Sequence, residues 1–349
     1  MRIKIGDVSC SFASRLLEAA ELLGADPSEL LAHTQIEPQI LSTPEGRIDS
    51  IDYMRLGYQA IQQTGSAHIG LTAGQQSTIT QLGLTGLAAM TSPTLGDAMR
   101  NFMRYEMLTS RSYRGQSKML IDGNDAIFQF YSIAPYNDYN TFVVDAVLAT
   151  WHKLACWLTN KTHLAKSLHL EFSKPSYHAA YEKVFACPIH YDQPFNGVII
   201  AAAALDETIA YDDPLLHQTL ITQCDQALNQ LLHAERFTHK VLKVLGPMLH
   251  GRNPTIEETA GQLGMPTWTL RRKLKEEDTT FQQLLDNMRK DLALSYMSDP
   301  SLSFGEISYI LGFSTPGAFQ RAFKRWANQT PGEYRKQLKK KTQVETSDT

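Results

Sequence analysis

The first third of the chain carries apolar residues at helical spacing. In Phe12–Leu23 they gather on one side of a helix, and Gly24 follows where a left-handed residue would end it. Asp26 precedes a proline in the order of an N-cap and a first-turn residue. Together these patterns predict helices at Phe12–Leu23, Pro27–His33, Ser50–Gln63, Leu82–Met90 and Thr94–Ser110.

Beyond residue 116 the apolar period shortens to the alternation of strands. Two alternating runs flank Gly123-Asn124-Asp125, a hairpin-like turn. The pattern predicts strands at Ser117–Asp122, Ala126–Ile133, Ser167–Phe172 and Gly197–Ala202, with helices at Tyr139–Trp157 and Ser176–Phe185. Because no βαβ unit repeats, we expect an α+β fold, with a mixed α/β domain over residues 1–210 rather than a doubly wound sheet.

A leucine-rich stretch follows Asp212-Asp213-Pro214. Residues 215–249 are predicted to form one or two helices, with a helical linker at 211–235 and a hinge near 246–254. An apolar stripe runs along the stretch and consists of Leu216, Leu220, Leu228, Leu231 and Leu232. The stripe fits a homodimer contact and ordinary packing against either domain equally well.

A helix-turn-helix pattern occupies Thr255–Lys275. Thr255 and Glu258 have the spacing of a capping box, and Gly264 follows the short helix that they begin. The next helix contains two leucines four residues apart, which would form its buried face. That face would hold Leu270 and Leu274, and the other faces Trp268, Arg271, Arg272 and Lys275.

The same pattern recurs over Ser303–Lys324. Ser303 and Glu306 repeat the capping pair, and Gly312 repeats the turn. The second helix would begin at Pro316 and bury Phe319 and Phe323 as its i, i+4 pair. Between the two copies, Phe281–Met297 predicts an amphipathic helix about 25 Å long at roughly 1.5 Å per residue, which would hold the two units at a fixed separation.

Two helix-turn-helix units in one chain indicate DNA binding. A recognition helix fits the major groove, and two helices on one face of a duplex stand about 34 Å apart. An arginine can form two hydrogen bonds with a guanine, and a glutamine can form two with an adenine. We therefore expect the bases to be contacted by Trp268, Arg271, Arg272, Gln320 and Arg321. Lys275, Lys324 and Arg325 suit phosphates, with a solvated helix face as the alternative for any one of these cations. We expect the first unit to discriminate bases more and the second to anchor more.

The C-terminal part, residues 236–341, resembles the DNA-binding domain of the AraC family of bacterial transcription regulators. The first unit matches that family at Ala260, Leu263, Gly264, Leu270, Arg272 and Lys275, and the second at Ile307, Gly312, Phe313, 318–324 and 330–335. The sequence departs at Pro266, where the family usually has a capping serine, so the first recognition helix is expected to enter the groove at a slightly different angle. Gly317 replaces a polar residue and cannot read a base.

The N-terminal part resembles the arabinose-binding-type regulatory domain found in one subgroup of that family. The matching residues are 82–84, 92–98, 177–185, 187–188 and 195–197. Members of the subgroup respond to varied small molecules. The two resemblances together imply a ligand-responsive transcription regulator, expected to be an activator, with double-stranded promoter DNA, RNA polymerase and an unidentified small-molecule effector as partners.

Charge is distributed unevenly between the N-terminal and the C-terminal parts of the chain. The whole chain has a formal net charge of −3, yet residues 236–349 hold 18 Lys and Arg against 12 Asp and Glu. The remaining residues, 1–235, hold 15 against 24. The basic part therefore contains the DNA motifs, and the acidic part is expected to keep non-specific DNA binding low.

Aromatic and polar residues of the N-terminal part are candidates for an effector pocket, because small-molecule sites combine aromatic walls with a few polar groups. The candidates are Tyr105, Arg111, Tyr113, Arg114, Tyr131, Trp151, His152 and Trp157. Core packing explains most of them equally well. His152 and Cys156 have metal-ligand spacing, but no third ligand is evident, and we expect neither a metal nor a cofactor.

The sequence argues against several other classes of protein. It contains no G-x-S-x-G, P-loop, G-x-G-x-x-G or H-E-x-x-H motif, and its four cysteines lack paired or CxxC spacing. We also expect no membrane span and no signal peptide, a cytoplasmic (nucleoid-associated) location, and a disordered tail at 342–349. Two alternatives stay open: an architectural DNA-binding protein without an effector, and an enzyme with an appended DNA domain that uses a reactive cysteine.

Overall fold

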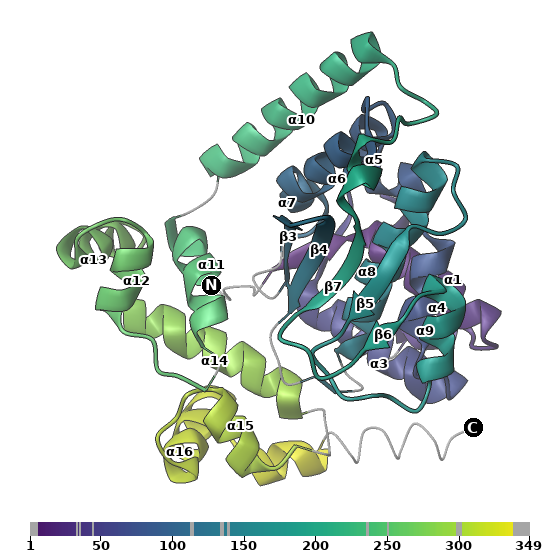
Figure 1. The fold of residues 1–349 in the computed structure, drawn as a ribbon. Helices are drawn as coiled ribbons and strands as arrows, with labels where there is room; N and C mark the ends of the chain where they lie inside the picture. Colours follow the sequence, from purple (N-terminus) through teal and green to yellow (C-terminus); the bar gives the residue numbers. More distant parts are fainter. Residues whose placement is uncertain are drawn as a thin grey trace. The chain divides into compact units, whose positions relative to one another are not determined.

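The computed structural model describes residues 6–337 except 33, 35, 44, 112–114, 133–135, 138–139, 235–236, 250 and 298–301. Contacts divide the chain into two compact units, with the boundary in sequence between residues 234 and 235 (Figure 1). The predicted tail, 342–349, lies outside the described residues. None of the described helices is both long and apolar enough to cross a membrane.

The N-terminal unit combines ten α-helices and seven strands among its described residues. The helices are α1 (Cys10–Leu22), α2 (Pro27–Ala32), α3 (Ser50–Thr64), α4 (Ile69–Gln76), α5 (Gly83–Met90), α6 (Leu95–Arg104), α7 (Glu106–Thr109), α8 (Thr141–Leu158), α9 (His178–Phe185) and α10 (Pro214–Ala234). The 3-10 turns are η1 (Pro38–Ser42), η2 (Ile79–Leu82) and η3 (Ala202–Asp206). The strands are β1 (Asp7–Ser9), β2 (Arg47–Asp49), β3 (Gly115–Asp122), β4 (Asp125–Ser132), β5 (Ala165–His169), β6 (Ile189–His190) and β7 (Asn196–Ala201).

Five of these strands form one sheet in the order β3-β4-β7-β5-β6, in which only the β5–β6 pair is parallel. The predicted hairpin joins β3 and β4. Asp122 pairs with Asp125, so the turn has two residues, and Gly123 supplies the positive φ of 56° that it needs. The mixed sheet, together with the helical C-terminal unit, confirms the predicted fold class.

Two large apolar cores and a small third one support the described part of this unit. In the first, the inward side chains of β4 and β7 pack against α8, which lies along the sheet in Figure 1. Phe128 and Phe130 alternate with half-buried neighbours along β4, as expected for a strand with one buried face. The second core joins α1, α2, α3 and α4, and Phe142 of α8 contributes to it. Because α8 serves both large cores, it is the central helix of the unit.

The sequence patterns missed α4. This helix contains two glycines, Gly70 and Gly74, which weaken helical propensity. A Cβ at Gly70 would lie 2.2 Å from the carbonyl oxygen of Phe142, and one at Gly74 would lie 2.5 Å from Cβ of Ala149. The glycines therefore allow the backbones of α4 and α8 to approach closely, and tertiary packing outweighs local propensity.

The prediction of a single helix at Thr94–Ser110 was wrong. Two helices, α6 and α7, occupy this stretch, and the chain bends at Tyr105 between them. The Tyr105 side chain is fully buried, and its hydroxyl donates a 2.8 Å hydrogen bond to Asp225 of α10. Tyr105 forms a small apolar core with Leu220 and Cys224 of α10. Packing of α10 on α5 and α7 thus explains part of the predicted leucine stripe, although Leu216 and Leu232 remain exposed.

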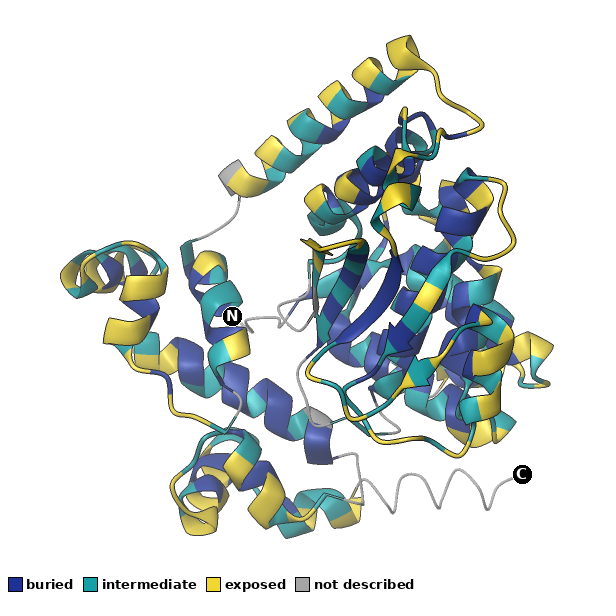
Figure 2. Ribbon diagram, in the orientation of Figure 1, coloured by how far each residue is buried: buried dark blue, intermediate teal, exposed yellow. Residues whose placement is uncertain are grey.

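The described part of the C-terminal unit consists of helices joined by loops and turns, without strands. Its helices are α11 (Phe237–Met248), α12 (Ile256–Gln262), α13 (Thr267–Glu276), α14 (Phe281–Met297), α15 (Phe304–Ile310) and α16 (Pro316–Ala327). Figure 1 shows α14 between the α12–α13 pair and the α15–α16 pair. In Figure 2, α14 is buried over much of its length, whereas α13 and α16 carry exposed positions. The helix α14 is therefore the core of this unit.

Candidate nucleic-acid interface

The first helix-turn-helix unit begins at a capping box. The Thr255 hydroxyl accepts a hydrogen bond from the Glu258 amide at 3.2 Å, and the Glu258 carboxylate accepts one from the Thr255 amide at 2.9 Å. The Thr255 amide and the Thr255 hydroxyl both donate to this carboxylate and so lower the pKa of Glu258. After α12, Gly264 adopts a φ of +64° and turns the chain toward α13.

The recognition helix of this unit, α13, buries one face and exposes the other. Leu270 and Leu274 are buried, as predicted, and Trp268 is 66% exposed. The Arg272 guanidinium lies 5.9 Å from the centre of the Trp268 ring, and its Nε is 3.8 Å from the Glu276 carboxylate. The two predicted base readers thus stack on each other on the exposed face. Arg271 and Lys275 are also exposed.

The start of α13 lacks a side-chain cap. Pro266 stands at the N-cap position and provides no oxygen for the first amides. In the second unit, by contrast, the Thr315 hydroxyl accepts a 3.2 Å hydrogen bond from the Ala318 amide at the start of α16. The replacement of a capping residue by proline therefore leaves the first turn of α13 without the side-chain acceptor that α16 has.

The second unit repeats the plan with aromatic residues. Ser303 and Glu306 form the capping box of α15, and Phe319 and Phe323 form the buried face of α16. The predicted readers and phosphate ligands are exposed on the other faces: Gln320, Arg321, Lys324 and Arg325. Gly317 is exposed as well, and a Cβ at this position would lie 3.6 Å from a terminal nitrogen of Arg321.

Arg289 of α14 was not singled out from the sequence, yet it joins the two helix-turn-helix units. Its side chain is 5% exposed, and Nε donates to the Leu311 carbonyl at 2.8 Å. One terminal nitrogen donates to Asn253 at 2.8 Å and to the Gly312 carbonyl at 3.1 Å. The guanidinium also stacks on Phe313, 4.7 Å from the ring centre. Arg289 therefore ties the turn of the second unit to the loop before the first.

Arg325 is exposed to solvent but also forms an ion pair within the protein. One of its terminal nitrogens lies 3.0 Å from the Asp286 carboxylate of α14, although the Arg325 side chain is 67% exposed. The ion pair holds the C-terminal half of α16 against α14. Arg325 would therefore have to give up a carboxylate partner in order to contact a phosphate.

The effector candidates that the structure describes do not gather at one site. Trp151 lines a cavity. Tyr105 is buried with its hydroxyl bonded to Asp225, His152 is buried beside Phe185 and Cys156, and Trp157 stacks on Tyr211. Tyr131 and Arg111 lie in half-buried positions outside that cavity, and Tyr113 and Arg114 fall outside the described residues.

His152 and Cys156 do approach each other, with 3.5 Å between Nε2 and Sγ. Burial lowers the pKa of His152 to about 4 and raises that of Cys156 to about 11, so both are neutral at physiological pH. Burial raises the pKa of the other three cysteines as well. Within the described ranges, no group of three or more His, Cys, Asp or Glu residues is placed to hold a metal ion.

The cavity lined by Trp151 has a volume of about 140 Å³ and lies inside the N-terminal unit. Its apolar wall includes Phe12, Met54, Phe102, Phe130, Val147 and Leu154, and its polar wall includes Arg15, Ser50, Ser77, Gln81, Thr85, Glu106 and Thr150. These residues come from segments that span positions 8 to 154. Sequence analysis missed all of them except Trp151, because no local motif brings them together.

Comparison with known protein families gave two matches that together cover most of the chain. Residues 24–209 match the model described as the arabinose-binding domain of AraC transcription regulators, and residues 259–337 match a helix-turn-helix domain. The ornithine utilization regulator of Pseudomonas aeruginosa is 27% identical over 94% of this chain and 96% of its own length.

Two further proteins are similar to this chain. The urease operon transcriptional activator of Escherichia coli is 37% identical over 82 residues, which are 24% of this chain and 28% of that protein. The crystal structure of the regulator CdpR from Pseudomonas aeruginosa is 20% identical, with a TM-score of 0.45, over 93% of this chain and 98% of that one.

Proposed function

This chain belongs to the AraC family of transcription regulators, in the group with an arabinose-binding-type N-terminal domain, and we propose how it acts on DNA. The protein is a helix-turn-helix regulator that binds promoter DNA and carries an N-terminal ligand-binding domain. In our proposal, α13 and α16 enter successive major grooves. The observation that carries the proposal is the pair of capped units whose exposed faces bear arginine and glutamine, joined by α14.

Each recognition helix has a distinct part in this proposal. Trp268, Arg271 and Arg272 contact bases in one groove, and Gln320 and Arg321 contact bases in the next. Lys275, Lys324 and Arg325 contact phosphates. The stack of Arg272 on Trp268 supports the first assignment, because a guanidinium held by an aromatic ring loses less freedom on binding. The first unit discriminates bases more strongly, and the second contributes more to anchoring.

The regulatory part of the proposal concerns the N-terminal unit. A small-molecule effector binds this unit with different affinities in two states of the protein and so biases DNA binding. Activation of transcription is supported by the similarity to the urease operon transcriptional activator, and RNA polymerase is the partner that we expect for it. A homodimer contact along α10 is supported by its exposed leucines, Leu215, Leu216 and Leu232. A protein that acts on promoter DNA belongs in the cytoplasm, at the nucleoid.

Substitution of the two proposed guanine readers tests the DNA model. Arg272→Ala and Arg321→Ala should each cost about 1 to 3 kcal/mol of binding free energy and relax the preference at one base pair. The measurement is titration of a DNA site, selected from random sequences, and of its single-base variants. Arg100→Ala is the matched control, because Arg100 is also an exposed helical arginine in an ion pair but lies in the N-terminal unit.

Three outcomes would count against the model. Wild-type affinity and specificity in both variants would remove Arg272 and Arg321 from the interface. Equal or larger penalties for base changes in the half-site of α16 would reverse the ranking of the two units. Selection that recovers no preferred sequence would favour an architectural DNA-binding protein over a promoter-specific regulator.

A further inference from the structure

Three buried polar atoms face the cavity of the N-terminal unit without a hydrogen-bond partner among the described residues. They are Nε of Arg15, Oγ of Ser50 and Oγ1 of Thr85. Ser50 is 6% exposed and Thr85 is 2% exposed. A buried hydroxyl or N–H without a partner costs about 1 to 3 kcal/mol, so unpaired groups that gather at one cavity require an explanation. A ligand that accepts hydrogen bonds from them provides one.

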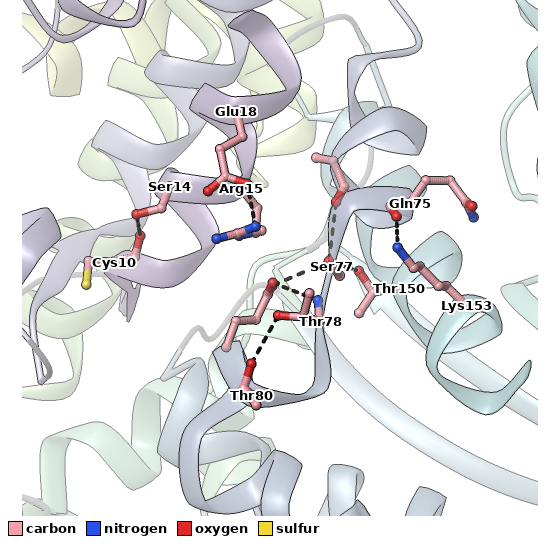
Figure 3. Close-up of polar contacts among 12 residues, drawn as sticks. Cys10, Ser14, Arg15, Glu18, Gln75, Ser77, Thr78, Thr80, Thr150 and Lys153 are labelled. Atoms are coloured by element: carbon pink, nitrogen blue, oxygen red, sulfur yellow. Dashed lines mark hydrogen bonds and ion pairs between the residues drawn. The ribbon is translucent and has the colours of Figure 1, made fainter. Parts of the chain in front are cut away.

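Within the described part of the chain, Arg15 is the only arginine or lysine in the wall of this cavity. It lies on α1, and one of its terminal nitrogens pairs with Glu18. Figure 3 shows the Arg15 side chain extending from α1 on the side of Ser77 and Thr150. Those two hydroxyls lie 3.0 Å apart and form a hydrogen bond with each other. Arg15 is therefore the charged donor at this end of the cavity. A guanidinium in an enclosed site favours an anionic oxygen.

The rest of the wall is mostly apolar. Phe102, Phe130, Trp151 and Leu154 contribute to it, together with Met54. The volume of about 140 Å³ is close to the roughly 150 Å³ at which an apolar protein cavity holds one benzene molecule. A sugar would bring a hydroxyl on nearly every carbon, and an apolar wall leaves most of those hydroxyls unpaired. The cavity therefore fits one ring or a short hydrocarbon chain.

Glu106 limits the charge of the ligand. Its carboxylate lines the same cavity and accepts hydrogen bonds from the hydroxyl and the amide of Ser117, the latter at 3.2 Å. A second anionic group on the ligand would meet this carboxylate in a poorly solvated space, where like charges repel strongly. Glu106 in the wall thus disfavours a second negative charge on a ligand whose first anionic group pairs with Arg15.

We propose that the effector of this protein is a small monocarboxylic acid with an apolar body about the size of one aromatic ring. Its carboxylate pairs with Arg15, the hydroxyls of Ser50 and Thr85 bond to its polar atoms, and its body packs against Phe102, Phe130 and Trp151. The assignment rests on the proposed function, because it names the ligand class of the regulatory site. It differs from the sugar that the name of the family would indicate.

The first test compares an acid with its neutral analogue. Phenylacetate and phenylacetamide are titrated into the full-length protein by calorimetry, with 1,4-phenylenediacetate as the dianion. Phenylacetate should bind about tenfold or more tightly than the amide and the dianion, because a hydrogen bond to a charged group outweighs one to a neutral group. Equal affinity for acid and amide, or no binding of the acid, would overturn the assignment.

Arg15→Met is the decisive variant, and Arg55→Met is its matched control. Arg55 also pairs with a carboxylate three residues away and is similarly half-buried, but it does not line the cavity. Arg15→Met should weaken phenylacetate binding about tenfold or more and change amide binding little, whereas Arg55→Met should change neither. Retention of the acid's affinity in Arg15→Met, or an equal loss in Arg55→Met, would contradict the proposed ion pair.

Thr85→Val and Ser50→Ala separate a ligand contact from a structural role. Because both hydroxyls are buried and unpaired, their removal should leave thermal stability without ligand unchanged or higher. The same changes should weaken phenylacetate binding several-fold. Loss of stability without ligand, or unchanged affinity in both variants, would show that these hydroxyls serve the fold rather than the ligand.

Failure of this assignment can be distinguished from failure of the proposed function. The selected DNA site is titrated in the presence of fractionated metabolites and, separately, of phenylacetate. A response of DNA binding to some metabolite fraction but not to the acid would overturn the ligand class and keep the regulatory model. Binding of the acid through Arg15 with no change in DNA affinity would keep the site and overturn its regulatory role.

Discussion

The two helix-turn-helix units follow one plan but are joined to the molecule in different ways. The turn of the second unit is enclosed: Gly312 lies against the backbone of Arg252, and Arg289 bonds to the Leu311 and Gly312 carbonyls. The turn of the first unit is open, since none of the described residues comes within 4 Å of a Cβ placed on Gly264. The same pattern in the sequence therefore describes one fixed turn and one open turn.

The difference between the two turns bears on the roles that we propose for the two helix-turn-helix units. The second unit has a side-chain cap at Thr315, aromatic contacts along the buried face of α16 and a buried arginine behind its turn. The first unit has an uncapped recognition helix but displays a tryptophan and two arginines. Rigidity is concentrated in the unit with fewer reading side chains, in agreement with an anchoring role for the second unit and a discriminating role for the first.

The largest expected effect comes from the two turn glycines. Alanine at either position must adopt a positive φ, which costs about 1 to 2 kcal/mol. At Gly312 the added Cβ would also lie 1.9 Å from the Arg252 carbonyl oxygen, so Gly312→Ala should lower the free energy of unfolding by roughly 3 kcal/mol or more. Gly264→Ala is the matched control and should lower it by about 1 to 2 kcal/mol. Chemical denaturation of both variants measures the difference, and equal losses would remove the contrast between the turns.

Removal of the Arg289 side chain should have the next largest effect. Arg289→Met keeps much of the apolar stem but leaves the carbonyls of Leu311 and Gly312 and the Asn253 side chain without this donor. We expect a loss of about 2 to 4 kcal/mol in the free energy of unfolding. DNA affinity at permissive temperature should fall too, because the two units lose their fixed separation. Arg289→Lys restores the charge but not the fork of donors, so recovery by lysine would argue against the bidentate link.

The smallest expected effect distinguishes two neighbouring cations of α16. Lys324→Ala should reduce the slope of log affinity against log salt by about one, the loss of one phosphate contact. Arg325→Ala should reduce it by less, because Arg325 is already paired with Asp286. Asp286→Asn releases Arg325 and should make the slope steeper. Identical slopes in the two alanine variants would mean that the ion pair breaks on DNA at no cost.

The C-terminal unit was largely predictable because its signals are local. Capping boxes, glycine turns and i, i+4 apolar pairs operate within a few residues, and α14 has the bounds that its apolar pattern predicted. What the sequence did not indicate in this unit was Arg289. A buried arginine within an amphipathic helix resembles any surface cation until the carbonyls of a distant turn are placed beside it.

The N-terminal unit was predictable in its elements but not in its cavity. The hairpin and α8 were found, yet α4 was missed because its glycines serve contacts with α8 that no local pattern shows. Of the aromatic pocket candidates, Trp151 lines the cavity, whereas Tyr105 lies in a core and Trp157 lies at the surface. The polar groups of the cavity, Arg15 and Thr85, are ordinary helix residues in the sequence. Only the tertiary fold brings them to one space.

The close contact of α4 with α8 has a consequence for the diversification of such regulators. Ala73 of α4 and Val147 of α8 line the cavity, while Gly70 and Gly74 set the distance between the two backbones. The distance is therefore fixed by main-chain atoms, and the lining side chains are free to vary around it. In the proposed effector site, specificity can therefore change through exchange of single wall residues while the scaffold keeps its dimensions.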